Sequence, residues 1–304
     1  MKDCMSSDLK KITKKIDKEF IHYFLPDAEM ETIFVVGSMA KYDYKDRQDN
    51  DYDIRVISKD VNSQKIINFE KFLKEMCQRL TTDEIEVGYS CLVGPVNHKV
   101  SENKKNILIH AMIHRKDQMD DFLPVTHKYQ YGTRYRIVYG KDSLKRFQDV
   151  RYTLDELLNA HEGLYYCIDM LKKREYRYLT WDVDGEKCEF NFHADKMPEE
   201  TVMENCFYST NKFVNNLMNY CRWNDYIIPD DKMKFTIDLL GEKNINEKVL
   251  YLLKGLYSKK EEILNEVFDN PVEATICLLE IFGERVKILD QIFEKNEKAK
   301  MLVK

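Results

Sequence analysis

The segment that most constrains this chain is an apolar run ending in Gly-Ser, followed after a polar spacer by two aspartates one residue apart. Phe34-Val35-Val36 leads into Gly37 and Ser38, and residues 39–50 separate Ser38 from Asp51-Tyr52-Asp53. Because side chains alternate across a β-strand, Asp51 and Asp53 should lie on the same face. Carboxylate oxygens so placed can share hard cations such as Mg²⁺. The pattern therefore predicts two strands that lead to a metal-binding pair of carboxylates.

Gly37 and Ser38 are candidates for contact with a phosphate group. Glycine lets the backbone approach a ligand closely, and the Ser38 hydroxyl with the loop N–H groups can donate to phosphate oxygens. No Gly-x-x-x-x-Gly-Lys loop competes for that role. The spacer also carries cations that can meet a triphosphate, with a merely solvated loop as the alternative for each: Lys41, Lys45 and Arg47.

Length and charge limit the class of protein. With 304 residues, two domains can each form a core, and we see neither an export signal nor an apolar run of about 18 residues. The eight cysteines form no Cys-x-x-Cys motif, so we expect free thiols and a cytoplasmic protein. The net charge of −5 and the lack of a sustained basic stripe argue against a long nucleic acid as partner. No membrane partner is expected.

The first part of the chain combines strands with helices that can cover them. Ser7 or Asp8 can cap a first helix that Pro26 ends. The following elements are expected in the order strand, strand, helix, strand and strand, at residues 32–36, 51–57, 62–80, 85–93 and 106–114. Because this is not a regular βαβ repeat, the pattern predicts an α+β fold with a mixed β-sheet.

The pattern becomes helical from Thr153 onward. Thr153-Leu154-Asp155-Glu156 is typical of a capping box. Further amphipathic helices are expected at residues 198–223, 247–257 and 271–293, after a segment over 178–192 that favours a hairpin or an ordered loop. We therefore expect one domain over residues 1–148 and a mainly helical domain over 149–304.

Gly-Ser, a spacer of this length and Asp-Tyr-Asp on a strand resemble the nucleotidyltransferase superfamily that includes DNA polymerase β. With its helical second half, the chain is most similar to the bacterial antibiotic nucleotidyltransferases, in particular the aminoglycoside adenylyltransferases. The specific part of the resemblance covers about residues 30–115. It implies that Gly37 and Ser38 hold the triphosphate and that Asp51 and Asp53 bind Mg²⁺.

The family pattern adds a third carboxylate on a later strand, and this chain departs from it there. The expected strand reads Ile107-Leu108-Ile109-His110-Ala111, with His110 where an acid is expected. An imidazole can act as a general base near neutral pH, although it is a poorer Mg²⁺ ligand than a carboxylate. Glu86 is the alternative if its strand lies beside Asp51 and Asp53. The remaining possibility is that neither residue takes the role.

The resemblance implies an enzyme that moves a nucleoside monophosphate, AMP from ATP, to a hydroxyl of a small molecule such as an aminoglycoside-like, cationic antibiotic. The first domain would be catalytic and the helical domain would bind the acceptor. Two alternatives stay open. One is transfer to a protein or tRNA, as in toxin–antitoxin and defence systems. The other is a catalytically weakened nucleotide-binding regulatory module, which the missing third acid favours.

Two further groups carry less weight. Acids on the first long helix of the second domain are expected to be salt-bridged surface groups rather than ligands of a cationic acceptor: Glu156, Glu162 and Asp169. An aromatic and basic run after the last expected strand is expected to pack between the domains rather than to stack on a nucleobase: Tyr129, Tyr131, Arg134, Tyr135, Arg136 and Tyr139.

Overall fold

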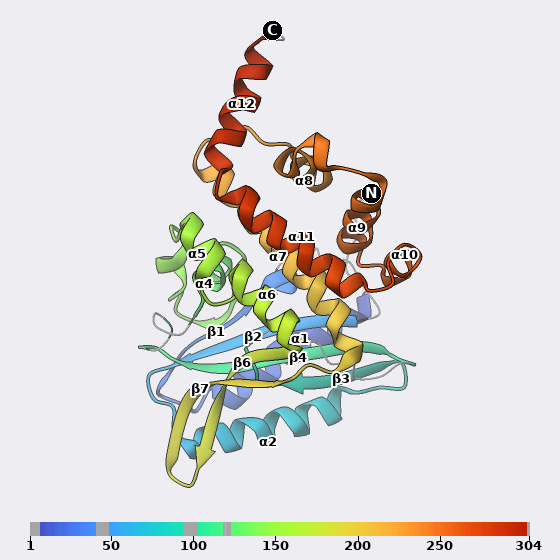
Figure 1. Cartoon of the computed structure of the whole chain (residues 1–304). Coiled ribbons are helices and arrows are strands. Elements are labelled where there is room, and N and C mark those ends of the chain that lie inside the picture. The colour runs from blue at the N-terminus through green and yellow to red at the C-terminus, as the bar shows by residue number, and fades with distance from the viewer. Residues whose placement is uncertain (1–6, 41–48, 94–102, 118, 120–122, 303–304) are drawn as a thin grey trace. The chain divides into compact units, whose positions relative to one another are not determined.

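The computed structural model describes residues 7–40, 49–93, 103–117, 119 and 123–302 (Figure 1). Contacts divide the chain into two compact units. The first comprises Met1–Leu123, His127–Val150 and Arg177–Ala194, and the second comprises Pro124–Thr126, Arg151–Tyr176 and Asp195–Lys304. The first unit contains a β-sheet with helices, and the second is mainly helical.

The first unit is built on a five-stranded mixed sheet with the strand order β3-β4-β2-β1-β5 (Figure 1). Its strands are β1 (Met30–Val36), β2 (Asp49–Ser58), β3 (Ile85–Ser90), β4 (Lys105–Arg115) and β5 (Tyr135–Gly140). Central strand β2 is antiparallel to β1 and parallel to β4, β3 is parallel to β4, and β5 is antiparallel to β1. The predicted mixed sheet is confirmed.

Helices α1 (Ser7–Phe24) and α2 (Ser63–Leu80) contribute to the larger core of this unit. The apolar positions of α1 recur at helical spacing, so residues such as Ile16 and Phe20 form one buried stripe. This stripe and Phe69 of α2 share a core with Tyr52 and Ile54 of β2. Alternation along β2 therefore turns Asp51 and Asp53 toward the opposite face.

A smaller core lies on that opposite face. It combines Phe34 and Val36 of β1 with Tyr131 of α4 (Val125–Thr133) and with Phe147 of the 3₁₀ turn η2 (Lys145–Phe147). Both α4 and β5 fall in the aromatic and basic run for which no element was predicted from the sequence. The alternation of β5 is weak, because its side chains are only half-buried or exposed.

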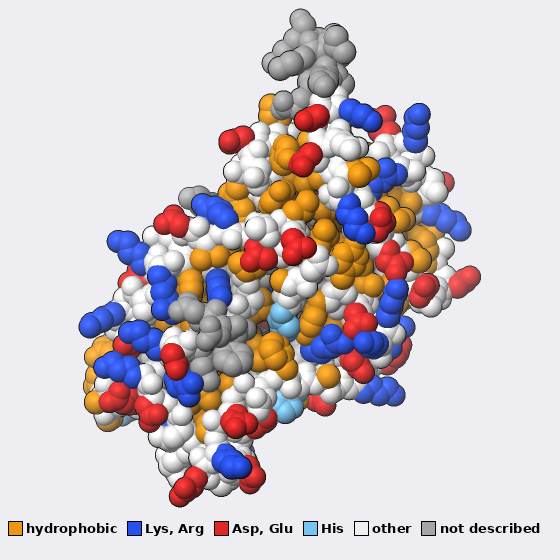
Figure 2. Space-filling view, turned by 60° about the vertical axis from the view of Figure 1, so that its left-hand side comes forward, with side chains coloured by type: hydrophobic (Ala, Val, Ile, Leu, Met, Phe, Trp, Pro, Cys, Tyr) orange, Lys and Arg blue, Asp and Glu red, His pale blue; other side chains and the backbone are white. Residues whose placement is uncertain are grey.

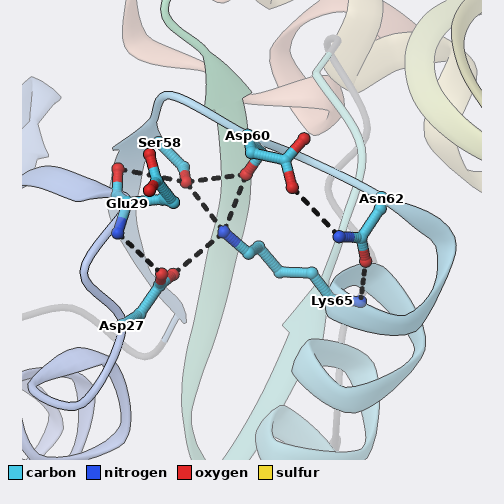
Figure 3. Close-up of polar contacts among 6 residues, drawn as sticks. All are labelled: Asp27, Glu29, Ser58, Asp60, Asn62 and Lys65. Atoms are coloured by element: carbon cyan, nitrogen blue, oxygen red, sulfur yellow. Dashed lines mark hydrogen bonds and ion pairs between the residues drawn. The ribbon is translucent and has the colours of Figure 1, made fainter.

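A polar cluster ties the end of β2 to the start of α2 (Figure 3). The Lys65 ammonium donates to the Ser58 hydroxyl at 3.0 Å and to the Asp60 carbonyl at 2.7 Å, and it pairs with Asp27 at 3.0 Å. The Asn62 side chain caps α2 by accepting from the Lys65 backbone N–H at 3.0 Å. These contacts hold the Ser58 end of β2 against the segment that leads into β1.

The segment for which a hairpin or an ordered loop was expected forms a hairpin of β6 (Glu175–Asp184) and β7 (Lys187–Lys196), which turns at Gly185-Glu186. Residues 177–194 of this hairpin belong to the first unit, whereas the sequence placed them in the second domain. The reason is burial: Trp181 and Phe190 join the larger core, and the Trp181 indole donates to the Ile113 carbonyl at 2.8 Å. Local spacing does not reveal such a long-range contact.

The second unit contains short and long helices around its own buried side chains. The capping box of Thr153 and Glu156 forms as predicted at the start of α5. Helix α5 spans Leu154–Asn159, and a 3₁₀ turn, η3, spans Glu242–Asn244. The remaining helices of this unit are α6 (Leu164–Lys173), α7 (Glu199–Trp223), α8 (Lys232–Leu240), α9 (Glu247–Ser258), α10 (Glu261–Asn265), α11 (Pro271–Val286) and α12 (Leu289–Leu302).

The prediction of a single helix over residues 271–293 is wrong, because this segment contains two helices. The chain turns after α11 and begins α12 at Leu289. This turn lets Leu289 and Phe293 become buried, and the Phe293 ring stacks on Tyr226 and Phe235 with centroid separations of 5.2 and 6.2 Å. The predicted α+β fold with a mainly helical C-terminal region is otherwise confirmed.

Within the described residues, no helix is long and apolar enough to cross a membrane. The cysteines that the structure describes are free thiols, as predicted: Cys77, Cys91, Cys167, Cys188, Cys206, Cys221 and Cys277. On the face shown in Figure 2, acidic and basic side chains are interspersed.

Candidate active site

Asp51 and Asp53 lie on the same face of β2, as their spacing predicted. The side chains between and after them, Tyr52 and Ile54, are completely buried in the larger core on the other face. The Asp51 side chain is 42% exposed and the Asp53 side chain 29%. The core thus anchors the strand while both carboxylates stay accessible to a ligand.

Gly37 and Ser38 lie at the end of β1, directly beside Asp53. Val36 is paired with Asp53 in the antiparallel register, and Gly37 opens the 3₁₀ turn η1 (Gly37–Ala40) with φ of +74°. A Cβ atom at Gly37 would lie 2.9 Å from the Asp53 Oδ2 atom. Two features therefore favour glycine at this position: the positive φ angle and the close approach of the Asp53 side chain. Ser38 is half-buried.

The structure brings His110 to the same site from β4. In the parallel register His110 is the partner of Asp53, and its Nε2 atom lies 3.8 Å from the Asp51 Oδ1 atom. That separation is too long for a hydrogen bond but short enough for one water or a substrate hydroxyl to contact both groups. His110 is 7% exposed, so protein atoms surround most of its side chain.

The structure does not bring Glu86 to the site. Strand β4 lies between β3 and β2, so the condition for Glu86 to take the third role is not met. Glu86 is paired with Asn106 near the start of β4, and its carboxylate contacts the Lys104 ammonium at 3.1 Å. The β3 residue at the level of His110 is Ser90. Lys41, Lys45 and Arg47 lie outside the described residues.

Arg55 is a site residue that the sequence analysis missed. It is 5% exposed, and its Nη2 atom contacts the Asp53 Oδ1 atom at 3.3 Å. The same guanidinium donates to the carbonyl oxygens of His110 and Ile54 and, through Nε, to the Tyr131 hydroxyl at 3.2 Å. Alternation along β2 was the signal that could have found it, because Arg55 follows Asp51 and Asp53 on the same face.

A buried histidine lies behind this arginine. His114 is 4% exposed, and its Nε2 atom has no hydrogen-bond partner among the residues that the structure describes. Burial, reinforced by the nearby charge of Arg55 and by His127, lowers the pKa of His114 to about 3. For Arg55 itself burial opposes the charged form, but Tyr131 and Asp53 outweigh it and raise the pKa of the guanidinium. The neutral ring of His114 adds no positive charge to the site.

The opposite face of β2 is fixed by a second polar cluster. The Tyr52 hydroxyl donates to Asp17 of α1, and Arg136 of β5 contacts both the Asp17 carboxylate at 3.0 Å and the Tyr52 oxygen at 2.9 Å. Tyr52 stands between the two candidate metal ligands along the chain. These contacts join segments far apart in sequence, so no local pattern indicates them.

Two carboxylates on one face of a strand can bind a Mg²⁺ ion when other ligands complete its coordination. Mg²⁺ keeps several waters and is usually held by one or two carboxylates together with substrate phosphates. Within the described parts of the chain, no group of three or more His, Cys, Asp or Glu side chains is arranged to hold a metal on its own. Asp51 and Asp53 are the side chains of this site that could hold such an ion.

The acids of the helical unit differ from one another. Asp169 is a surface acid paired with Lys173 at 2.9 Å, as expected, and Glu156 closes the capping box of α5. Glu162 is not a surface acid: it is 7% exposed and forms a buried ion pair with Lys212. The Tyr208 hydroxyl accepts from the same ammonium at 2.8 Å. A buried charge requires such a partner, which spacing on a helix does not predict.

Comparisons with known proteins find similarity among solved structures only. No family model matches the chain, and no curated protein sequence matches it. Among solved structures the search returns a nucleotidyltransferase, the class that the sequence pattern resembles. It is the spectinomycin adenyltransferase from Enterococcus faecialis, determined with ATP and spectinomycin, with a TM-score of 0.45 and 9% identity over 91% of this chain and 99% of that one. A likeness at this level does not establish a shared activity.

Proposed function

We propose that this protein is a nucleotidyltransferase that moves a nucleoside monophosphate from a nucleoside triphosphate to a hydroxyl group. One observation carries the proposal. The Gly37-Ser38 turn at the end of β1 lies against Asp53, and Asp51 lies on the same face of β2 beside the His110 ring. A phosphate-approaching turn, two accessible carboxylates and a potential base are the parts that this reaction requires.

The residues have distinct roles in the proposed reaction. Gly37 and Ser38 would hold the outer phosphates by close backbone approach and by hydroxyl donation. Asp51 and Asp53 would hold Mg²⁺, which when bound neutralises charge on the phosphates. His110 would accept the proton of the attacking hydroxyl, because its Nε2 atom lies 3.8 Å from Asp51 Oδ1 on the accessible face. No covalent intermediate with the protein is required.

The proposed donor is ATP, and the proposed acceptor is a small, hydroxyl-bearing cation of the aminoglycoside kind. A net charge of −5 favours a cationic acceptor over a polyanion such as RNA.

The test is to incubate the purified protein with Mg²⁺, each nucleoside triphosphate and a panel of aminoglycosides and related amino alcohols, and to measure the mass of each acceptor. A gain of one nucleoside monophosphate with release of pyrophosphate is the expected result. Asp51→Asn and Asp53→Asn should abolish it, whereas Asp83→Asn, the same change at an exposed turn, should not. Wild-type turnover in either folded site variant would contradict the proposal.

A second candidate is a nucleotide-binding module with weakened catalysis. The observation that favours it is the imidazole of His110 in the place where the family pattern has a third carboxylate. This candidate predicts that the protein binds a triphosphate with Mg²⁺ by calorimetry and that Ser38→Ala weakens the binding. It also predicts no transfer to any small molecule, protein or tRNA offered.

A further inference from the structure

A buried cation lies inside the candidate metal site itself. The Arg55 guanidinium is almost fully enclosed and pairs with the Asp53 Oδ1 atom at 3.3 Å. The other oxygen of that carboxylate, Oδ2, faces Gly37. One oxygen of Asp53 is thus paired with a buried cation before any ligand binds. Asp51 is more exposed, and its ion-pair contact within the described residues is the longer one with His110.

The formal charge of this site is small for a pair of metal-binding aspartates. Asp51 and Asp53 contribute two negative charges, and Arg55 cancels one of them. Divalent cations are drawn to oxygen sites largely by the charge of the ligands, so this cancellation weakens the attraction. The guanidinium cannot relieve the effect by losing its proton, because arginine stays charged in proteins.

We propose that Arg55 keeps the affinity of the free protein for a divalent cation low, so that the metal binds together with the nucleoside triphosphate. Arg55 acts through Asp53 and is a positioning residue. The proposal rests on the proposed function, because it takes Asp51 and Asp53 as the metal ligands. The triphosphate oxygens then supply the charge that the protein lacks. A benefit of this arrangement is that little metal is held in the site without its substrate.

The size of the effect follows from the distances. A cation bound about 2.1 Å from an Asp53 oxygen would lie about 5–6 Å from the guanidinium that contacts the same carboxylate. At that separation, even a dielectric constant close to that of water makes a unit charge change the affinity for a divalent cation by about tenfold. The contact is half-enclosed by protein, so tenfold is the minimum expected.

The experiment measures binding of Mn²⁺, in place of Mg²⁺, by electron paramagnetic resonance without nucleotide. Arg55→Met and Arg55→Gln remove the charge and should tighten Mn²⁺ binding at least tenfold. Arg55→Lys keeps the charge and should stay within about threefold of the parent. Arg79→Met is the matched control, since Arg79 pairs with Glu19 at 2.7 Å on the helices α2 and α1. It should change nothing.

The sign of the change separates this role from a purely structural one. If Arg55 only supported the fold, neutral variants would bind Mn²⁺ more weakly, and that result overturns the proposal. Folding is checked by circular dichroism, and failure of both neutral variants to fold also overturns it. Asp51→Asn and Asp53→Asn test the proposed function separately. If they leave Mn²⁺ binding unchanged, the metal site is wrong; if they abolish it while the Arg55 variants behave like the parent, only the present inference fails.

Discussion

The two candidate metal ligands should differ sharply in what their removal does to stability. From the sequence alone, clustered carboxylates repel each other, which predicts that Asp51→Asn and Asp53→Asn each melt at or slightly above the parent temperature. The structure changes this expectation for Asp53. Its carboxylate compensates the buried charge of Arg55, so Asp53→Asn removes the charge partner of an enclosed guanidinium.

The magnitude follows from the contact. Removing one partner of a fully buried ion pair costs about 3–5 kcal/mol. The Asp53 side chain is 29% exposed and the contact is long at 3.3 Å, and asparagine still offers an oxygen acceptor. We therefore expect a loss of about 1–2 kcal/mol in the free energy of unfolding. For a domain of this size that corresponds to a melting temperature lower by roughly 2–8 °C. The Asp51 side chain is 42% exposed, and its contact with His110 is long at 3.8 Å. The free energy of unfolding of Asp51→Asn should therefore stay within about 0.5 kcal/mol of the parent value.

The assay is equilibrium unfolding in urea at neutral pH with a metal chelator, supported by thermal melts. Asp83→Asn, at an exposed turn of the same unit, controls for the loss of a surface carboxylate. The reasoning is refuted if Asp53→Asn is as stable as the parent, or if Asp51→Asn loses as much as Asp53→Asn. Either result would mean that Asp53 does not compensate Arg55 in solution.

Three other outcomes are expected. Ser38→Ala should weaken use of the triphosphate by about 1–2 kcal/mol with every acceptor, because the lost hydrogen bond is to the shared donor; a deficit in steady-state kinetics that depends on the acceptor would contradict this role. His110→Ala should lose about 10²–10⁴ in rate at unchanged triphosphate affinity, whereas Glu86→Gln should behave like the parent; the reverse pattern would place the base on β3. Burial lowers the pKa of His114 from 6.5 to about 3. Below pH 6.5 the unfolded chain therefore binds a proton that the folded protein does not bind, and stability should fall as the pH drops through this range. At pH 5 the loss due to this group is about 2 kcal/mol, and urea unfolding of His114→Gln at several pH values should show a shallower slope than the parent.

Local patterns were sufficient to predict the parts of the site that lie on one strand or one turn. Alternation placed Asp51 and Asp53 on one face, and the apolar run before Gly37 marked the end of β1. Both depend on neighbours within a few residues. The position of His110 required a further step, the pairing of β2 with β4, for which the sequence offered two alternatives. Only the strand order decided between His110 and Glu86.

Other parts of the site depend on contacts between distant segments, and no spacing reveals these. Tyr52 is held by Asp17 and Arg136, residues from the first helix and the last strand of the sheet. The hairpin strands β6 and β7 join the first unit because Trp181 fits its core, although the chain has by then entered its helical part. In each case tertiary burial outweighs the local pattern.

His110 and Arg55 act in the same direction on the charge of the candidate site. A carboxylate at position 110 would add a negative charge beside Asp51, whereas the imidazole adds none when neutral. Arg55 then cancels the charge of Asp53. Together they leave a site whose described residues carry little net negative charge but include an accessible carboxylate, the His110 imidazole and the Gly37-Ser38 turn. Such a site can hold a divalent cation well only when phosphate oxygens share it. The missing acid is therefore compatible with catalysis, provided that the substrate supplies the charge that the protein lacks.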